Sequence, residues 1–364
     1  MKKILFVGGG TLGPVTPLLA VARVLRRQHP DFLFAWIGTQ NGPERPLIES
    51  VGIPFYILPE AKFPRHPDRR WLSFPRDWLR ARHEARRLIR ELKPSAVVSV
   101  GGFTAVPMVM VASSMGIPCV THQLDVQPGL SNRQIASRCV SVTTSFAYNR
   151  PPFGRGVKTR VIATPTRFSA RDLPSREEGC AVFEFDPARP VLLVFGGGTG
   201  AQPLNEWMER AAPSLIRSTQ ILHVTGSHKL TTELERAARS FCGYHVVSFL
   251  QEEMLHAYAA ADVIVCRGGL GSFSEMATFK KSALIVPIPH SHQEINAQRF
   301  QESDAAEIVS QLDPQFDDVM HQRIEKLLNQ PRRRAQLGKH AHELLPTDDG
   351  TALAKQVLDA MNRT

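Results

Sequence analysis

Two glycine-rich loops in this sequence have the residue types that bind phosphate groups. Residues 8–17 read Gly-Gly-Gly-Thr-Leu-Gly-Pro-Val-Thr-Pro, and residues 196–201 read Gly-Gly-Gly-Thr-Gly-Ala. Glycines let the backbone approach a ligand closely, and a helix that starts after them presents free N–H groups and the positive end of its dipole. The first loop fits neither a dinucleotide-binding fingerprint nor a P-loop, so a plain tight turn stays an alternative for it. Together the loops predict two anionic groups at the carboxyl ends of parallel strands.

Two further segments carry polar side chains suited to a nucleotide sugar. In residues 266–275, Cys-Arg-Gly-Gly-Leu-Gly-Ser-Phe-Ser-Glu, a strand ends at glycines and a helix is expected from about Ser272. Glu275 would lie in the first turn, where its carboxylate can accept both hydroxyls of a ribose. A capping box between Ser272 and Glu275 is a compatible alternative. Gln293 and Glu294 open a helix directly after a strand and can hold sugar hydroxyls.

Metal chemistry is not indicated by the residue spacing. His290 and His292 lie two residues apart in an irregular loop, where solvated histidines are the simpler interpretation. The five cysteines are scattered and form no Cys-x-x-Cys pair, which is typical of buried thiols in a reducing compartment. No Asp-x-Asp occurs, so the usual metal–carboxylate handle for a sugar nucleotide is missing. We expect neither a metal nor a cofactor.

The elements that must position these motifs alternate between strands and helices. Apolar runs followed by glycines or polar residues predict buried strands at residues 4–7, 96–100, 119–121, 191–195, 221–224, 263–266 and 283–286. Helical patterns follow at residues 17–28, 201–218 and 293–303. This alternation is typical of parallel sheets covered by helices, an α/β fold.

The strand-then-glycine pattern starts twice, which predicts two domains. Residues 165–189, between the two starts, are rich in charge and proline and lack a strong period. We expect a first domain at residues 1–164 and a second at residues 165–340. Residues 341–364 should end in a helix that folds back on the first domain.

The net charge of +10 is concentrated in one segment. From Lys62 to Arg90 there are ten Lys or Arg and three Asp or Glu, a local excess of 10 − 3 = +7. Residues 74–92 can form a helix in which basic side chains surround apolar ones, a pattern that favours an anionic membrane surface. An ordinary solvated helix packed on the sheet is the alternative. The residues concerned are Trp78, Leu79, Leu88 and Ile89 with Arg76, Arg80, Arg82, Arg86, Arg87 and Arg90.

Other destinations for this chain are disfavoured by its sequence. No helix-turn-helix, zinc-finger or RNA-binding motif accompanies the basic segment, so we expect no nucleic-acid partner. No apolar run approaches the roughly 18 residues that span a bilayer. The apolar run at residues 4–7 is too short for a signal peptide. We therefore expect a cytoplasmic protein.

The motifs also occur in a recognisable order. The chain carries Gly-Gly-Thr at 9–11, Gly-Gly-Phe at 101–103, His-Gln-Leu-Asp at 122–125 with Gly-Leu-Ser-Asn at 129–132, the second glycine loop, Arg-Gly-Gly and Ser-Glu at 267–269 and 274–275, and Gln-Glu with Asn-Ala at 293–297. This set resembles the MurG family over nearly the whole chain. That family transfers N-acetylglucosamine from UDP-N-acetylglucosamine to the muramyl sugar of lipid I, undecaprenyl-pyrophosphoryl-MurNAc-pentapeptide, making lipid II for peptidoglycan.

The resemblance implies an inverting transferase with a GT-B fold, two Rossmann-like domains facing a cleft. It implies a peripheral protein at the cytoplasmic face of the inner membrane, with a lipid-linked acceptor and an anionic inner-leaflet surface as partners. Glu275 looks like the ribose ligand, and Phe249 and Leu250 fall where the uracil is held. The other implied contacts are Arg167, Gly198 and Thr199 at the donor diphosphate, Gln293 and Glu294 at the donor sugar, Gly10, Thr11 and Gly13 at the acceptor diphosphate, and Trp78, Arg80, Arg86 and Arg87 at the membrane.

The chain departs from the family in two of these motifs. The family's Gly-Thr-Gly-Gly-His has Leu12 here in place of a glycine and Pro14 in place of the histidine, and its His-Glu-Gln-Asn reads His-Gln-Leu-Asp at residues 122–125. Because proline cannot move a proton, the general base should lie elsewhere in the first domain. Asp125 is our first hypothesis, since a carboxylate can accept a proton where the family's amide cannot. His122, expected to begin the same loop, is the second, with a structural role as its alternative.

Three other functions stay open on the sequence. The first is transfer to another lipid or a small-molecule acceptor, which turnover of lipid I would separate. The second is a UDP-N-acetylglucosamine 2-epimerase, which shares the fold and would act without an acceptor. The third, suggested by Pro14, is a weakly active paralogue that binds UDP without transfer.

Overall fold

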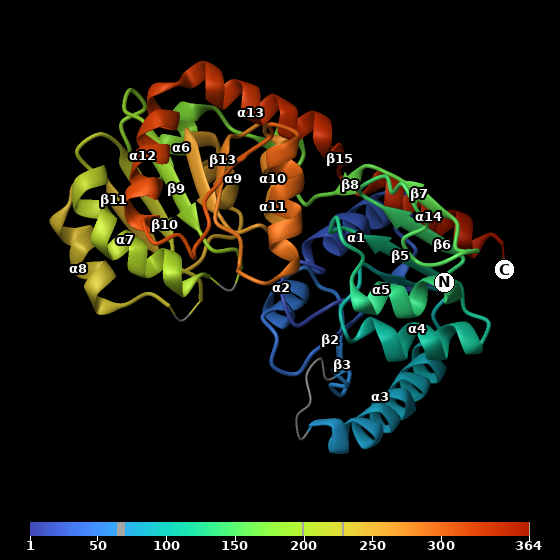
Figure 1. Cartoon of the computed structure of the whole chain (residues 1–364). Helices are drawn as coiled ribbons and strands as arrows, with labels where there is room; N and C mark the ends of the chain where they lie inside the picture. The colour runs from blue at the N-terminus through green and yellow to red at the C-terminus, as the bar shows by residue number, and fades with distance from the viewer. Residues whose placement is uncertain (64–69, 199, 228, 364) are drawn as a thin grey trace. The chain divides into compact units, whose positions relative to one another are not determined.

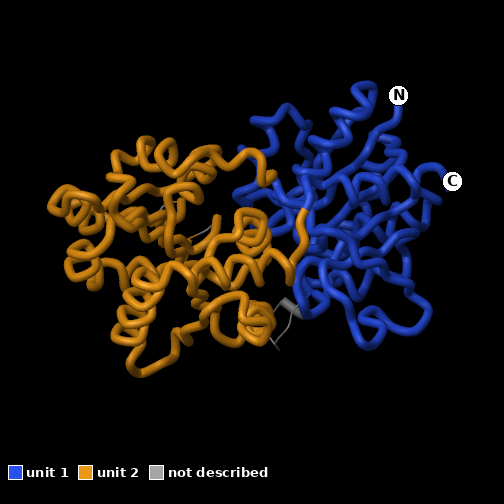
Figure 2. The backbone as a smooth tube through the Cα atoms, turned by 90° about the horizontal axis from the view of Figure 1, so that it is seen from above, with its two compact units in different colours: residues 1–167, 348–364 blue, residues 168–347 orange. Residues whose placement is uncertain are grey.

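The computed structural model describes residues 1–63, 70–198, 200–227 and 229–363. The chain divides into two compact units, coloured separately in Figure 2: unit 1 is residues 1–167 and 348–364, and unit 2 is residues 168–347. The boundary after Arg167 lies slightly beyond the expected residue 164, and the chain returns to unit 1 at Asp348. Arg167 is therefore the last residue of the first segment of unit 1, where the sequence had placed it in the second domain.

Unit 1 contains a seven-stranded parallel sheet (Figure 1). The strand order is β3-β2-β1-β4-β5-β6-β7, which contains the doubly wound order of Rossmann-like folds. Its strands are β1 (Lys3–Val7), β2 (Leu33–Gly38), β3 (Phe55–Ile57), β4 (Ala96–Ser99), β5 (Cys119–Gln123), β6 (Ser141–Thr144) and β7 (Thr159–Val161), followed by the short β8 (Thr164–Pro165).

Helices cover both faces of this sheet. One face carries α1 and the C-terminal α14, which contact each other, and α14 also packs on β4, β5 and β6. The other face carries α3 and α4, whose apolar residues share a core cluster with β1 and β4 (Figure 1). The helices of unit 1 are α1 (Thr16–Gln28), α2 (Glu44–Ser50), α3 (Arg70–Leu92), α4 (Ala105–Ser114), α5 (Leu130–Ile135) and α14 (Thr351–Met361), with a 3-10 turn at Ala136–Arg138.

Unit 2 repeats this architecture with six parallel strands in the order β11-β10-β9-β12-β13-β14. These are β9 (Val191–Phe195), β10 (Gln220–Val224), β11 (Tyr244–Val247), β12 (Val263–Cys266), β13 (Ala283–Ile285) and β14 (Glu307–Ile308), with β15 (Thr347–Asp348) at the exit. The helices are α6 (Arg176–Val182), α7 (Gln202–Leu215), α8 (Thr232–Ser240), α9 (Met254–Ala260), α10 (Leu270–Thr278), α11 (His292–Glu302), α12 (Phe316–Asn329) and α13 (Pro331–Leu344), with a 3-10 turn at Ala170–Asp172.

The two parallel sheets confirm the predicted α/β class with two Rossmann-like units. All seven strands predicted from apolar runs are present, because residues buried on both faces of a parallel sheet are apolar throughout, as in the wholly buried β9. In each unit the strand order reverses between two neighbouring strands, β1 and β4 in unit 1 and β9 and β12 in unit 2. Ligands of doubly wound sheets bind at the carboxyl ends of the strands beside this reversal.

Candidate active site

The first glycine loop lies at the strand reversal of unit 1, directly after β1. The neighbouring strand β4 is followed by Gly101 and Gly102, both with left-handed backbone (φ +103° and +91°), and then by Phe103. The ring of Phe103 packs against Gly10, itself at φ +87°: a Cβ on Gly10 would lie 3.1 Å from Phe103 Cε1. A side chain at Gly10 would be strained and crowded, so glycine is required there.

A buried carboxylate, that of Glu44, binds the backbone of this loop. Glu44, the first residue of α2, has no exposed surface. Its Oε1 accepts hydrogen bonds from the N–H of Thr39 at 2.7 Å and from Thr39 Oγ1 at 2.6 Å, and its Oε2 accepts the N–H of Gly10 at 3.2 Å. The Gly10 amide is therefore engaged with Glu44, and the role predicted for Gly10 at the acceptor diphosphate stays a prediction.

The outer part of the loop stays open to solvent. Thr11 and Gly13 are exposed, and nothing but the Thr11 side chain lies within 4 Å of a Cβ built on Gly13. Both remain candidates for the acceptor diphosphate. Residues 8–16 contain no Lys, Arg or His. The loop itself can therefore bind an anion only through its backbone N–H groups, the hydroxyls of Thr11 and Thr16, and the dipole of α1.

His122 does not lie where the sequence suggested. It is inside β5 rather than at the start of the following loop, and it has no exposed surface. Its Nδ1 lies 2.9 Å from Thr143 Oγ1 and its Nε2 lies 3.1 Å from Ser145 Oγ. Burial lowers the pKa of His122 from 6.5 to about 3. The imidazole is therefore neutral with both nitrogens engaged, which argues against His122 as a base and supports its structural alternative.

The loop that carries Asp125 is held by two neighbouring amides. Gln123 donates from Nε2 to the carbonyls of Asp125 at 3.0 Å and Gln127 at 3.2 Å, and its Oε1 accepts from Gly129 N at 3.3 Å. Asn132 Nδ2 donates to the same Oε1 at 2.7 Å. A glutamate at position 123 could not donate to those carbonyls, so the glutamine suits this loop conformation.

Asp125 itself is half-buried and belongs to the loop beyond β5. Tyr148 Oη donates to the Asp125 carbonyl at 3.2 Å, and burial together with the negative charge of Asp125 raises the pKa of Tyr148. Tyr148 is therefore a neutral hydrogen-bond donor near neutral pH. Asp125 remains our candidate for the general base of unit 1.

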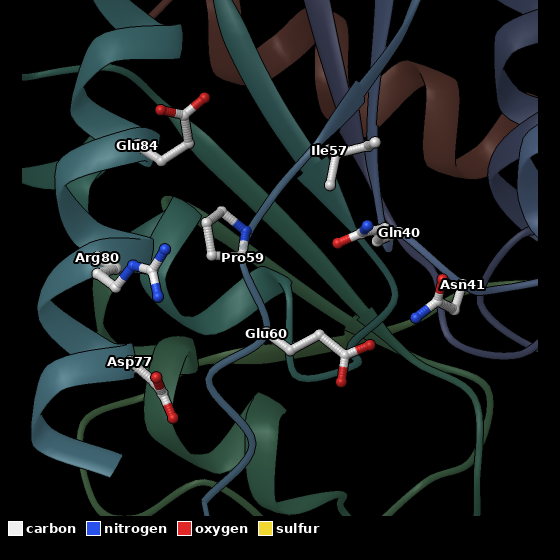
Figure 3. A pocket seen from close by; sticks show the side chains of 8 residues that line it. All are labelled: Gln40, Asn41, Ile57, Pro59, Glu60, Asp77, Arg80 and Glu84. Atoms are coloured by element: carbon white, nitrogen blue, oxygen red, sulfur yellow. The ribbon is translucent and has the colours of Figure 1, made fainter. Parts of the chain in front are cut away.

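A pocket of about 370 Å³ opens in unit 1 at the carboxyl ends of β2 and β3 (Figure 3). Its walls are the loop after β2, the segment after β3 and one side of α3. The lining residues are Gln40, Asn41, Ile57, Pro59, Glu60, Asp77, Arg80 and Glu84. Gln40 directly follows Thr39, which donates to Glu44, the carboxylate that also accepts the N–H of Gly10. Three carboxylates and two amides suit a ligand rich in N–H or O–H groups.

Helix α3 carries the residues predicted to meet a membrane. Leu88 and Ile89 are buried in the core and Trp78 packs partly against it, whereas Leu72 and Leu79 are 87% and 64% exposed. The exposed apolar side chains are thus in the N-terminal half of the helix and do not include the two residues near its end.

The basic residues of α3 have different surroundings. Arg80 lines the pocket, and Arg86 is exposed. Arg87 forms ion pairs with Glu84 at 2.6 Å and with Glu91 at 2.8 Å. Of the helices in the described ranges, none has the length and apolarity required to cross a bilayer.

The second glycine loop lies at the strand reversal of unit 2. It is closed by contacts that only glycine allows: a Cβ on Gly196 would collide with Ala201, and one on Gly200 (φ +70°) would collide with the carbonyl of Thr225. Gly198 lies in this loop, whereas the predicted Thr199 lies outside the described residues. Lys229 Nζ donates to the Gly200 carbonyl at 3.2 Å, which brings a cation to the loop that sequence reasoning had not identified.

Glu275 lies beside the same reversal, on α10. The helix begins at Leu270 with Gly269 in extended conformation as its N-cap, so Glu275 lies in the second turn and not in the predicted first turn, and Ser272 is not the N-cap that the alternative capping box required. The side chain is 6% exposed, and its Oε2 accepts a hydrogen bond from Tyr258 Oη at 2.8 Å. Tyr258, fully buried on α9, fixes this carboxylate and was also missed.

The loops before α10 and α11 are joined to each other. Asn296, buried on α11, donates from Nδ2 to the Gly268 carbonyl at 3.1 Å. Arg267 Nη1 donates to the carbonyl of Val286 at 3.0 Å, and burial lowers the pKa of this guanidinium. Within the described residues its Nε is buried with no hydrogen-bond partner.

The pair predicted to read the donor sugar closes the turn before α11. Gln293 Oε1 accepts from the N–H of Ile288 at 3.2 Å, and Glu294 Oε2 accepts from the N–H of His290 at 3.0 Å. His290 has a left-handed backbone, φ +56°, so this turn needs the support. With one oxygen of each side chain bound to the turn, Gln293 Nε2 and Glu294 Oε1 are the atoms that could bind sugar hydroxyls.

The remaining predicted donor residues lie in two places. Phe249 and Leu250 follow β11 at its carboxyl end, with Phe249 39% exposed and Leu250 buried. Arg167 ends the first segment of unit 1, where its carbonyl accepts from Arg23 Nη1 at 3.0 Å. The uracil and diphosphate roles of these residues stay predictions.

A second buried histidine lies near the second glycine loop, in unit 2. His223, within β10, lies 3.0 Å from Asn205 Oδ1 through Nε2 and 3.0 Å from Tyr244 Oη through Nδ1. Asn205 Nδ2 donates to the carbonyl of Thr225, and burial lowers the pKa of His223 to about 3. The network ties the start of α7 to β10. A histidine between the apolar residues Leu222 and Val224 of β10 was the available signal for it.

Comparisons with known proteins agree with this organisation. Residues 4–144 match the glycosyltransferase family 28 N-terminal domain, and residues 191–353 match the glycosyltransferase family 28 C-terminal domain. A UDP-N-acetylglucosamine–N-acetylmuramyl-(pentapeptide) pyrophosphoryl-undecaprenol N-acetylglucosamine transferase from Nocardioides sp. is 34% identical, with 98% of each chain covered. The protein of the same name from Bifidobacterium adolescentis is 31% identical, covering 98% of this chain and 97% of its own. The crystal structure of Acinetobacter baumannii MurG superposes with a TM-score of 0.73 at 24% identity, covering 99% and 100% of the chains.

Proposed function

Because the chain belongs to glycosyltransferase family 28, as a member of its N-acetylglucosamine transferase branch, we propose that it transfers N-acetylglucosamine from UDP-N-acetylglucosamine to undecaprenyl-pyrophosphoryl-MurNAc-pentapeptide. The relatives that carry this name match over almost the full chain. Unit 2 would hold the donor and unit 1 the acceptor, each at the strand reversal of its own sheet.

The observation that carries the proposal is the fixed carboxylate of Glu275. It is buried in the second turn of α10, the helix that follows β12, and Tyr258 donates a hydrogen bond to one of its oxygens. A carboxylate held in this way can accept two ribose hydroxyls without losing side-chain freedom on binding. The exposed face of Phe249 at the end of β11 suits the flat uracil ring.

The reaction would be a single displacement with inversion. The muramyl hydroxyl attacks the anomeric carbon of the donor sugar while the bond to the UDP oxygen breaks. Asp125 would take the hydroxyl proton, and the second glycine loop with Lys229 would stabilise the charge that grows on the departing diphosphate. Gln293 and Glu294 would hold the sugar hydroxyls and so align the anomeric carbon.

The acceptor's lipid tail requires contact with a membrane, and α3 suits that role. Leu72 and Leu79 are exposed in its N-terminal half, and the exposed cations of the same helix include Arg80, Arg82 and Arg86. Apolar side chains enter the lipid interface while cations near the surface are attracted to anionic headgroups by about 1 kcal/mol each. We therefore expect α3 to bind the anionic cytoplasmic leaflet of the inner membrane.

Acceptor dependence of UDP release tests this function against its rivals. We expect UDP release from UDP-N-acetylglucosamine only when a lipid I analogue is present, and not with diacylglycerol as acceptor. Conversion of UDP-N-acetylglucosamine to its 2-epimer without acceptor would instead identify an epimerase. UDP binding with no release under any condition would identify the inactive paralogue.

A further inference from the structure

The first glycine loop is poorly equipped to bind a diphosphate by itself. Its Gly10 amide donates to Glu44, and this carboxylate adds a negative charge beneath the loop. Residues 8–16 contain no cationic side chain. A ligand that carries two or more negative charges therefore needs a cation contributed by another part of unit 1.

Lys62 supplies a cation at this place. It follows β3 in the chain, and its Nζ lies 4.5 Å from the centroid of the Phe103 ring. The same ring packs on Gly10, with Cε1 at 3.1 Å from the position of a Cβ. A cation over an aromatic face is attracted by the ring's quadrupole, and the N–H groups that point away from the ring stay available for other acceptors. Phe103 thus seats the ammonium group beside the first loop.

The ion partner of Lys62 is easily exchanged. Lys62 Nζ lies 3.0 Å from Glu60 Oε2, and the two side chains are 52% and 41% exposed. An exposed pair of this kind contributes little to stability, because water screens both charges. A doubly charged phosphate group can therefore replace the carboxylate at small cost. Glu60 already lines the pocket, so its carboxylate can stay there, exposed to water, when it separates from Lys62.

We propose that Lys62, seated on Phe103, is the cationic ligand of the acceptor's diphosphate in unit 1. The proposal rests on the function proposed above for the nature of the ligand, a polyprenyl diphosphate sugar. That diphosphate is not the leaving group, so its charge does not change during transfer. Lys62 should accordingly bind the acceptor equally in the ground state and the transition state, which affects the acceptor KM and leaves kcat nearly unchanged.

Three variants test the assignment. Lys62→Met removes the charge and keeps the length, and Lys62→Arg keeps the charge. Lys2→Met is the matched control. Lys2 is exposed and precedes β1, so it lies at the amino ends of the strands, whereas the first glycine loop lies at their carboxyl ends. With the full-length protein, KM for a lipid I analogue should rise roughly tenfold or more in Lys62→Met, equivalent to about 1.4 kcal/mol. It should stay near wild type in the other two variants, and the donor KM should not change in any of them.

Farnesyl diphosphate gives a readout that needs no turnover. Calorimetry should show that it binds the wild type and Lys2→Met more tightly than Lys62→Met. Equal acceptor KM and equal farnesyl diphosphate affinity in wild type and Lys62→Met would overturn the assignment, and so would a fall confined to kcat. If the wild type fails to use lipid I but Lys62→Met still loses farnesyl diphosphate affinity, the proposed function fails while the diphosphate site stands.

Discussion

Replacing Glu44 by glutamine should destabilise unit 1 and loosen the first glycine loop. The carboxylate has no exposed surface and accepts three hydrogen bonds, two from Thr39 and one from Gly10. In Glu44→Gln the amide oxygen can keep both donors of Thr39. The amide nitrogen then faces the Gly10 N–H, which loses its acceptor.

The expected loss of stability follows from these contacts. A buried donor left without a partner costs about 1–3 kcal/mol, and two charge-assisted bonds become neutral ones. We expect the free energy of unfolding to fall by about 2–4 kcal/mol. Glu49→Gln is the matched control on the same helix: the Glu49 side chain is 49% exposed and, among the described residues, its ion partner is Arg45, so loss of this charge should cost less than about 1 kcal/mol.

Urea unfolding followed by fluorescence measures this difference. Trp36 is a suitable reporter, because it is fully buried and its Nε1 donates to the Gly8 carbonyl at 2.7 Å. Hydrogen exchange should also become faster at the amide of Gly10 in Glu44→Gln, and less so at the amide of Thr39, which keeps an acceptor. In activity assays the acceptor KM should rise and the donor KM should stay constant. Equal urea midpoints for Glu44→Gln and Glu49→Gln would refute the reasoning that Glu44 anchors the loop.

Four further predictions concern both units. Glu275→Gln should weaken UDP binding roughly tenfold to a hundredfold by calorimetry, since a charge-assisted hydrogen bond contributes about 1.5–3 kcal/mol; unchanged affinity in a folded variant would exclude the ribose role. The pKa of His122 is lowered from 6.5 to about 3 in the folded protein, so the stability that its neutral form contributes is complete above pH 6.5 and is lost as the pH falls toward 3. Between pH 7.5 and 5.5 the free energy of unfolding should therefore fall by about 1.4 kcal/mol more in the wild type than in His122→Gln. Equal falls in urea titrations of the two proteins would contradict this. Asp125→Asn should lower kcat about 10²-fold with little change in donor KM, and wild-type kcat would exclude Asp125 as the base. Arg86→Glu should weaken sedimentation with anionic vesicles but not neutral ones, whereas Leu79→Ser should weaken both; no effect of either would count against α3 as the membrane contact.

The parts of the fold that depend on local patterns were predictable from the sequence. Strand β9 is five apolar residues buried on both faces, and any run of that kind followed by glycines indicates a parallel strand. The same reasoning found the two glycine loops and the helices behind them. The start of α10 was placed two residues late, because Ser272 and Glu275 suggested a capping box whereas Gly269 in extended conformation is the N-cap.

The polar contacts between distant parts of the chain were not predictable. His122 was expected in a loop, since histidine is uncommon in a buried strand, but hydroxyls 21 and 23 residues away satisfy its nitrogens and allow β5 to continue. Glu44 lies 34 residues from Gly10, in a short helix with no motif around it. Such pairs form only when neighbouring strands bring them together, so a single sequence contains no local signal for them.

Formation of lipid II tests most directly whether the protein transfers N-acetylglucosamine to lipid I. Purified full-length protein would be given UDP-N-acetylglucosamine with a labelled sugar, lipid I and anionic phospholipid, and the lipid fraction would be analysed by mass and by the configuration of the new glycosidic bond. We expect one labelled N-acetylglucosamine per lipid I, joined with inverted anomeric configuration, and an equal amount of UDP released. Label that never enters the lipid fraction, or that enters it with retained configuration, would contradict the proposed inverting transfer.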